Sequence, residues 1–337
     1  MEKFSRWRDA GTGIHPFLHP VPPRADRSGL AMANKVLKDY LLGPVLAIAR
    51  FILLAADALI WLAAEALCLL VQLVFPVLQR PLRRLLVGLC ARLALLIVGV
   101  HWIKVDTATL RRGLKKNDGS VRSGDIIVAN SAGYLDILYF AFRFAPTFTR
   151  VYGDRVVPVT VWQMLCGCVR AEMEPPEDAM PLKTLVHRAQ QQRLGPIVVL
   201  PEATTSNGRA LLRFSPVFRN FDPEAAHAHI HIIGFKYPYE HYCPTYALGN
   251  PYSHLFRLCC QYNNAMTVRY LSPSECPTTA TPEPREGQSP TDDPLGEEIA
   301  VLLGQMARLR RTQLGVADKR EFLEYYAHRS SGQVRKR

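Results

Sequence analysis

The chain has 337 residues, 48% of them hydrophobic, and its 41 Lys and Arg against 29 Asp and Glu give a formal net charge of +12. This length suits one large domain with appendages or two smaller domains, each with a sizeable core. The positive charge favours an anionic partner: nucleic acid, an anionic membrane, or a phosphorylated or CoA-bearing substrate. Hydrophobic residues are concentrated between residues 41 and 103, which favours the membrane over nucleic acid. The eight cysteines form no Cys-x-x-Cys pair, so zinc-finger spacing is excluded and reduced thiols on the cytosolic side are expected.

Residues 1–34 are rich in Pro, Arg, Gly and His and show no helical hydrophobic period, so we predict a flexible arm. A long apolar run follows from residue 40 to residue 78, interrupted by Arg50, Asp57 and Glu65. A membrane span needs about 20 apolar residues, and the run is long enough, although carboxylates are unfavourable in lipid. We expect a membrane-inserted helix or helical hairpin. A buried helix of a soluble domain is the alternative.

The next segment, residues 80–98, carries Arg84, Gly88 and Arg92 at helical spacing, so one face is cationic and the rest is apolar. That pattern is typical of a helix that lies in the interface beside anionic headgroups, and a second span is the alternative. The arginines at the start of this segment indicate the cytosolic side of the membrane. We therefore predict that residues 35–103 form membrane-inserted and interfacial helices, either as a single span or as a hairpin.

Beyond Trp102 short apolar runs alternate with helical patterns. This alternation predicts an α/β domain over residues 104–271, with a mixed, largely parallel sheet flanked by helices. The expected strands are residues 100–105, 126–129, 156–161 (a strand or a loop), 197–200, 229–235 and 266–271, and the expected helices are residues 137–144 and 182–193. A segment rich in Pro, Thr, Ser and Glu at residues 272–294 predicts a disordered linker. Residues 295–337 predict an amphipathic helix, expected at residues 295–314, and a basic tail.

The strand expected at residues 126–129 ends in Asn130-Ser131 and a glycine, and Asp136 follows one turn later. This pattern is typical of a buried strand, a tight turn and a helix that carries Asp136 in its first turn. Such junctions place polar side chains at the edge of an α/β sheet, where binding sites form. A carboxylate held close to a turn usually orients a base, yet this stretch contains no histidine.

A second motif follows the strand expected at residues 197–200. The chain continues as Pro201-Glu202 and then as a loop of small polar residues, which closes in an Asn-Gly pair and Arg209. The hydroxyls and backbone N–H groups of such a loop, with a guanidinium beside them, suit a phosphate. An ordinary Asn-Gly turn is the alternative interpretation.

Together the two stretches resemble motifs of the glycerolipid acyltransferase family, typified by the lysophosphatidic acid acyltransferases. The first motif of that family, Asn-His-x-x-x-x-Asp, corresponds to residues 130–136, and the third, Phe-Pro-Glu-Gly-Thr-Arg-Ser, corresponds to residues 200–206. The extension through Arg209 is most similar to the subgroup of fungal lysophosphatidic acid:oleoyl-CoA and lysophosphatidylcholine acyltransferases. Gly167-Cys168-Val169-Arg170 is a faint form of the second motif, and residues 232–237 fit the fourth.

The resemblance covers roughly residues 100–271. It implies an O-acyltransferase that acylates lysophosphatidic acid or a related lysophospholipid, with acyl-CoA as co-substrate and with no metal, no other cofactor and no nucleic-acid partner. It also implies attachment to the endoplasmic reticulum membrane or a lipid droplet, with the domain facing the cytosol. The implied catalytic positions are Ser131 and Asp136, and the implied substrate-binding positions are Asn130, Pro201, Glu202, Thr204, Thr205 and Arg209.

Three substitutions depart from the motifs of the family. In the family, the histidine takes the proton from the acceptor hydroxyl and the aspartate orients its imidazole, whereas this chain has Ser131 in place of the histidine. A serine hydroxyl is no base at neutral pH, so a proton-transfer contribution of about 10²–10⁴-fold is lost unless another group supplies it. Ala203 replaces the glycine of the third motif and Thr205 replaces its arginine. The alternative function is therefore a catalytically impaired pseudoenzyme that binds lipid or a protein partner at the membrane.

A substitute base has two possible sources. Asp136 would serve only if burial raised its pKa far above about 4. Histidines elsewhere are the other source, with structural or surface roles as the alternative. They are His187 on an expected helix and His227, His229 and His231 about the strand after the third motif.

Overall fold

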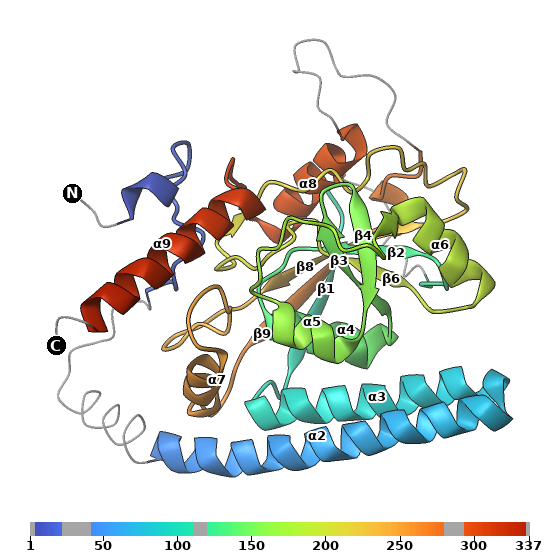
Figure 1. The fold of residues 1–337 in the computed structure, drawn as a ribbon, viewed down its shortest axis with the longest axis horizontal. Helices are drawn as coiled ribbons and strands as arrows, with labels where there is room; N and C mark the ends of the chain where they lie inside the picture. The colour runs from blue at the N-terminus through green and yellow to red at the C-terminus, as the bar shows by residue number, and fades with distance from the viewer. Residues whose placement is uncertain (1–3, 22–41, 111–119, 280–292, 335–337) are drawn as a thin grey trace.

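A computed structural model shows the fold and describes residues 4–21, 42–110, 120–279 and 293–334 (Figure 1). Its centre is an eight-stranded sheet in the order β1-β9-β8-β2-β6-β3-β4-β5. The strands of this sheet are β1 Ile103–Ala108, β2 Ile126–Ala129, β3 Thr147–Tyr152, β4 Arg155–Val159, β5 Met180–Pro181, β6 Ile197–Val199, β8 Ile230–Lys236 and β9 Met266–Leu271. A separate pair consists of β7 Ala210–Leu211 and β10 Arg310–Arg311.

The α/β class and the mixed sheet with flanking helices are confirmed, whereas a largely parallel sheet is not. β2 pairs in parallel with β6 and β8, β3 with β6, and β1 with β9. The pairs β3–β4, β4–β5 and β8–β9 are antiparallel. β3 and β4 are joined by a two-residue turn in which Gly153 has a φ of 62°. So short a connection permits only antiparallel pairing.

Helices cover both faces of the sheet, because alternate side chains of each strand point to opposite sides. The helices are α2 Gly43–Val74, α3 Pro76–Val98, α4 Tyr134–Phe144, α5 Val161–Gly167, α6 Leu182–Gln191, α7 Pro251–Cys259, α8 Pro294–Ala307 and α9 Val316–Val334. On β2, Ile127 and Ala129 join a core with α3, α4, α5 and α7. Ile126 and Val128 join a second core with α6 and α8. Every residue of β2 is therefore buried, which explains its uninterrupted apolar sequence.

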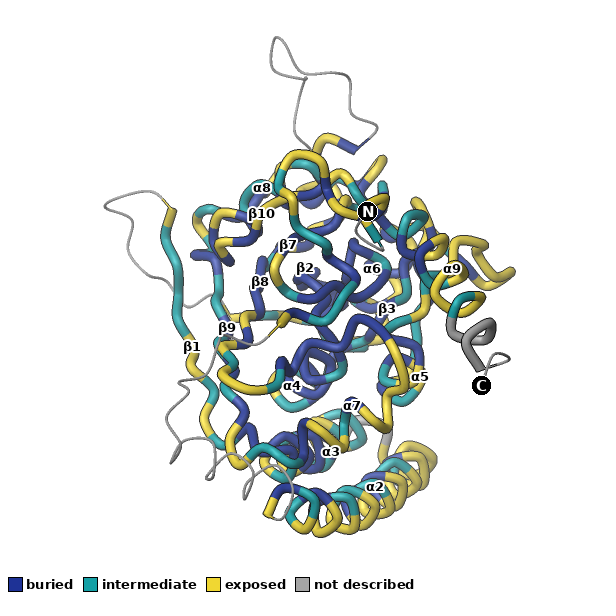
Figure 2. The backbone as a smooth tube through the Cα atoms, turned by 90° about the vertical axis from the view of Figure 1, so that its left-hand side faces the viewer, coloured by how far each residue is buried: buried dark blue, intermediate teal, exposed yellow. Residues whose placement is uncertain are grey.

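α2 and α3 lie side by side along one edge of the molecule, and α3 lies closer to the sheet (Figure 1). α2 is the one helix in the described part of the chain that is long and apolar enough to cross a membrane, and 22% of its most apolar stretch is buried. The outer side of α2 is exposed along most of its length (Figure 2). α3 instead buries Val87, Ala91 and Leu95 in the core. More than one membrane helix at this end of the chain is therefore not confirmed.

A buried arginine ties α2 to the domain. The guanidinium of Arg50 donates hydrogen bonds to main-chain carbonyl oxygens at the ends of α3 and α7: those of Val98, Cys259, Gln261 and Tyr262, at 3.5, 2.9, 2.5 and 3.0 Å. These carbonyl oxygens lie at helix ends, where an intrahelical partner is lacking. Arg50, which interrupts the apolar run in the sequence, thus fixes α2 to the rest of the fold through these hydrogen bonds.

The two ends of the chain pack together. Residues 4–21 belong to the segment expected to be a flexible arm, but here they contain a short 3-10 helix at Ser5–Trp7. Trp7 and Phe17 are buried against Phe322 of α9, in a small apolar cluster of their own. The rest of the expected arm, residues 280–292 of the expected linker and the last three residues lie outside the described residues. The helix expected at 295–314 ends at Ala307, and α9 was not predicted.

Candidate functional site

The turn after β2 is held together by Asp136. The main-chain N–H groups of Ala132 and Gly133 donate to Asp136 Oδ2 at 2.7 and 3.0 Å. The hydroxyl of Tyr237, just beyond β8, donates to Asp136 Oδ1. The predicted strand, turn and helix are therefore present, and the carboxylate satisfies free N–H groups at the start of α4.

These contacts leave Asp136 fully buried. Burial raises the pKa of Asp136 to about 7, although the hydrogen bond from Tyr237 and the two main-chain bonds act in the opposite direction. None of the hydrogen-bond partners of Asp136 in the described part of the chain is an imidazole. Asp136 therefore acts on the turn and on Tyr237 rather than on a catalytic histidine.

Glu202 joins the two predicted motifs. Its Oε1 accepts from the N–H of Ser131 at 2.7 Å, and its Oε2 accepts from the N–H of Leu212 at 3.0 Å. The N–H of Ser206 donates to the carbonyl oxygen of Ser131 at 2.9 Å, so each of the two motifs donates a hydrogen bond to the other. Burial raises the pKa of Glu202 to about 8. Both carboxylate oxygens are committed to the main chain, so Glu202 fixes the position of Ser131 and does not face a ligand.

Asn130 has a similar positional role. Its Nδ2 donates to the carbonyl oxygen of Phe235 at 3.2 Å, and its Oδ1 accepts from the N–H of Phe235 at 2.7 Å. This double contact aligns the end of β2 with β8. Pro201 is also buried, at the start of the second loop.

A buried lysine from α9 supports the second loop. Lys319 Nζ donates to the carbonyl oxygen of Thr205 at 2.6 Å and lies 3.4 Å from Thr205 Oγ1. It also lies 5.7 Å from the centre of the Phe17 ring. Burial lowers the pKa of Lys319 to about 7. Thr205 stands at the position where the third motif of the resembling family has an arginine, and the amine of Lys319 from the far end of the chain contacts Thr205.

The structure also shows the backbone conformation of Ala203 and the hydrogen-bond partner of Arg209, two further residues of this loop. Ala203 has a φ of 54°, the left-handed conformation for which the glycine of the family is suited and which disfavours alanine. Arg209 Nη2 donates to the hydroxyl of Tyr239 at 2.7 Å. Arg209 is not among the described residues that line the cavity beside Ser131.

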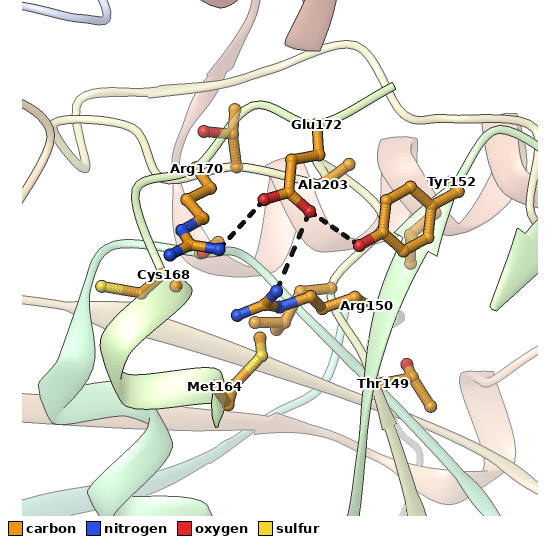
Figure 3. Close-up of a pocket in the computed structure, with 13 residues that line it drawn as sticks. Thr149, Arg150, Tyr152, Met164, Cys168, Arg170, Glu172 and Ala203 are labelled. Carbon is orange, nitrogen blue, oxygen red and sulfur yellow. Dashed lines mark hydrogen bonds and ion pairs between the residues drawn. The ribbon is translucent and has the colours of Figure 1, made fainter. Parts of the chain in front are cut away.

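A small cavity opens beside Ser131 (Figure 3). Of the predicted site residues, Ser131 and Thr204 line it. The others, Asn130, Asp136, Pro201, Glu202, Thr205 and Arg209, are not among the described residues that line it. Sequence reasoning missed its charged residues, which are Arg150, Arg170 and Glu172. The faint second motif, Gly167–Arg170, was the available signal, because Gly167, Cys168 and Arg170 all line this cavity.

The histidines considered in the sequence do not approach this cavity. His231 Nε2 lies 3.4 Å from Asp125 Oδ2, and Asp125 precedes β2 whereas Ser131 follows it. This pair therefore lies at the opposite end of the strand. His187, His227 and His229 are exposed.

Another histidine, His254, lies beside the first motif. Its Nε2 is 3.0 Å from the carbonyl oxygen of Thr245 and must donate to it, so Nδ1 accepts from the hydroxyl of Tyr134 at 2.8 Å. Burial lowers the pKa of His254 to about 4. Both ring nitrogens are occupied, so His254 supports α4 as a neutral side chain.

Known proteins similar to this chain are named as acyltransferases. The chain is 26% identical over 329 residues to a fission yeast (Schizosaccharomyces pombe) protein named "Putative lysophosphatidic acid:oleoyl-CoA acyltransferase", and the match covers 96% of this chain and 98% of that protein. It is 25% identical over 256 residues to "Lysophospholipid acyltransferase LPEAT1" of Arabidopsis thaliana, covering 68% of this chain and 60% of the relative. It is 23% identical over 185 residues to "Lysophospholipid acyltransferase LPEAT2" of the same plant, covering 54% of this chain and 32% of the relative. No family model and no solved structure matches the chain.

Proposed function

We propose that this chain, which is similar to proteins named as lysophospholipid and lysophosphatidic acid acyltransferases, transfers an acyl group from acyl-CoA to lysophosphatidic acid or a closely related lysophospholipid. The product would be phosphatidic acid or the corresponding phospholipid, with free CoA. The observation that carries the proposal is that Ser131 and Thr204, from two motifs far apart in the sequence, line one cavity. These are the positions at which the family carries its base and its phosphate loop.

In this reaction the acceptor hydroxyl attacks the thioester carbonyl, a C–O bond forms, and the C–S bond breaks. The hydroxyl proton ends on the departing thiol. Because Ser131 is no base, the residues of the cavity act by holding the two substrates together. Orientation of this kind lowers a barrier by up to about 7–11 kcal/mol. Asp136 contributes by fixing the turn that carries Ser131.

We also propose that α2 lies in the plane of the membrane, at the endoplasmic reticulum or a lipid droplet, with the domain on the cytosolic side. The exposed face of α2 is rich in leucine and isoleucine, and Leu59, Ile60 and Leu70 are each more than half exposed. Arg50 and α3 hold α2 along the domain rather than away from it. An interfacial helix fits this arrangement better than a span.

Reconstituted acyl transfer tests the proposal. The purified chain in liposomes receives oleoyl-CoA and lysophosphatidic acid, and the measured products are phosphatidic acid and CoA. Asp136→Asn, which loses the charge that binds the turn, should lower the rate at least about tenfold, because two hydrogen bonds to a charged group weaken. Glu174→Gln, an exposed change outside the cavity, serves as the matched control. An unchanged rate in folded Asp136→Asn, or no transfer by the wild type, contradicts the proposal.

A second candidate is a pseudoenzyme that binds lipid at the membrane. Two observations favour it: Ser131 in the place of the base, and the engagement of Asp136 by Tyr237. Measurable acyl transfer by the wild type excludes this candidate. A wild type that binds lysophosphatidic acid without any transfer supports it.

A further inference from the structure

Two arginines converge on one glutamate at the cavity beside Ser131 (Figure 3). Arg170 Nη1 lies 3.2 Å from Glu172 Oε1, and Arg150 Nη1 lies 3.9 Å from Glu172 Oε2. The hydroxyl of Tyr152 donates to the same Oε2 at 2.9 Å. The pKa of the Glu172 carboxyl is lowered by the hydrogen bond from Tyr152 and by both arginines, so the group is ionised at neutral pH.

Arg150 is held in position by α5. Its Nη2 donates to the carbonyl oxygen of Gln163 at 2.5 Å. The guanidinium also fills the space over Gly167, where any Cβ would collide with it. Its Nε is buried and has no hydrogen-bond partner among the described residues. The glycine of the faint second motif thus makes room for Arg150, which retains an unused donor.

The ion pairs of Glu172 with the two arginines add little to the stability of the fold. The side chains of Arg170 and Glu172 are 62% and 43% exposed, and exposed ion pairs add little to stability. Two guanidinium groups with parallel donors are, in contrast, well suited to a phosphate. A phosphate monoester carries a charge of about −1.5 to −2 and three acceptor oxygens, so it competes effectively with a single carboxylate for these donors.

We propose that Arg150 and Arg170 bind the phosphate of the acceptor lipid and that Glu172 occupies their guanidinium groups until the phosphate displaces it. This inference rests on the proposed acceptor class and extends it. Glu172 is an internal competitor, which favours a phosphate monoester over a phosphodiester of lower charge. Gly167 is a positioning residue, because its missing side chain allows Arg150 to reach the cavity.

Binding is measured on the full chain in lipid nanodiscs, by calorimetry, with a short-chain lysophosphatidic acid below its micelle concentration. Lysophosphatidylethanolamine of the same chain length is the second probe. Arg150→Gln should weaken binding of lysophosphatidic acid by about 10- to 100-fold, the effect of losing a charged hydrogen-bond partner. Glu172→Gln should tighten it by about two- to tenfold, since it removes a partly exposed competitor and leaves an oxygen for Tyr152.

Gly167→Ala tests the position of Arg150 independently. Gly167 lies in helical conformation and its Cβ would meet only the movable end of Arg150, so the variant should fold. It should weaken binding of lysophosphatidic acid in the same direction as Arg150→Gln. The matched controls are Arg188→Gln and Glu174→Gln, which make the same changes in net charge outside the cavity and should leave the Kd within twofold.

The proposal is overturned if Arg150→Gln and Glu172→Gln bind lysophosphatidic acid as the wild type does. It is also overturned if Glu172→Gln selectively weakens lysophosphatidylethanolamine, because Glu172 would then pair with an ammonium group. Acyl transfer measured in parallel separates the two proposals. Transfer without any response of binding to these variants removes the phosphate site alone, whereas the expected binding shifts without transfer support the site and remove the enzymatic activity.

Discussion

The Tyr237 hydroxyl donates to one carboxylate oxygen of Asp136. In the family the aspartate of the first motif orients a histidine, but here Asp136 Oδ1 accepts from the Tyr237 hydroxyl and Oδ2 accepts from two main-chain N–H groups. An imidazole introduced by Ser131→His therefore has to compete with the Tyr237 hydroxyl for Oδ1. Adding Tyr237→Phe releases Oδ1. We expect the double variant to exceed the single variant in acyl transfer.

The magnitudes follow from the contacts. A well-placed general base contributes about 10²–10⁴-fold. A hydrogen bond to a charged group is worth about 1.5–3 kcal/mol, and the imidazole of the single variant must displace such a bond from Tyr237. This requirement removes about 10- to 100-fold of the gain. Ser131→His should thus raise the rate by at most about 10³-fold, and the double variant by up to about 10⁴-fold.

The assay is acyl transfer from oleoyl-CoA to lysophosphatidic acid in liposomes across pH 5 to 9. A working imidazole should add a dependence on a group that titrates near pH 6.5. Tyr237→Phe alone should destabilise the fold by about 1–3 kcal/mol, because the buried carboxylate loses a donor. Tyr239→Phe, which removes a hydroxyl that contacts Arg209, is the control. Equal rates for the single and double variants would refute competition between Tyr237 and an imidazole.

Three further predictions concern charge and surface. Lys319→Met should remove a pH dependence of the free energy of unfolding. Burial lowers the pKa of Lys319 from 10.5 to about 7, so between these pH values the unfolded chain binds more protons than the folded chain. The free energy of unfolding of the wild type therefore rises by up to about 1.4 kcal/mol per pH unit in this range. Urea unfolding at pH 7 and 8.5 should show this gain in the wild type and not in the variant, and parallel curves would contradict it. Arg50→Met should lower the free energy of unfolding by about 2–5 kcal/mol, because buried main-chain carbonyl oxygens lose their donors, and thermal unfolding measures this loss. Leu59→Asn with Leu70→Asn should weaken liposome flotation at least about tenfold, since each leucine buried in lipid contributes about 1.5–3 kcal/mol; unchanged flotation would place the membrane contact elsewhere.

The parts of the fold that the sequence predicted are those whose pattern is local. β2 and β6 were predicted within one residue because each is a short apolar run that follows turn residues. β3 was missed because polar residues interrupt its apolar ones. α7 was missed although Asn250, which accepts from the N–H groups of Tyr252 and Ser253, carried a recognisable start signal before a proline.

The residues of the site, too, were predictable only where a local sequence pattern marks them. Ser131 and Thr204 were named as site positions from the resemblance of the two motifs, and both line the cavity. Lys319 and Arg150 were not expected, because no local pattern connects α9 or β3 to the site. Tyr237 lay in the stretch that fits the fourth motif, but its hydrogen bond to Asp136 was not predicted. Only the tertiary structure brings these residues together.

The packing of both chain ends around the second loop has a consequence for biosynthesis. Asn207 Nδ2 donates to the carbonyl oxygens of His15 and Leu18 at 2.8 and 2.9 Å, and Lys319 holds Thr205 from the opposite end of the chain. The contact of Lys319 cannot form until α9 has left the ribosome. The sheet can assemble during translation, whereas the loop of the third motif reaches its final form only after synthesis of α9. Late closure of such distant contacts is slow, so a nascent chain has a folded scaffold before it has a finished site.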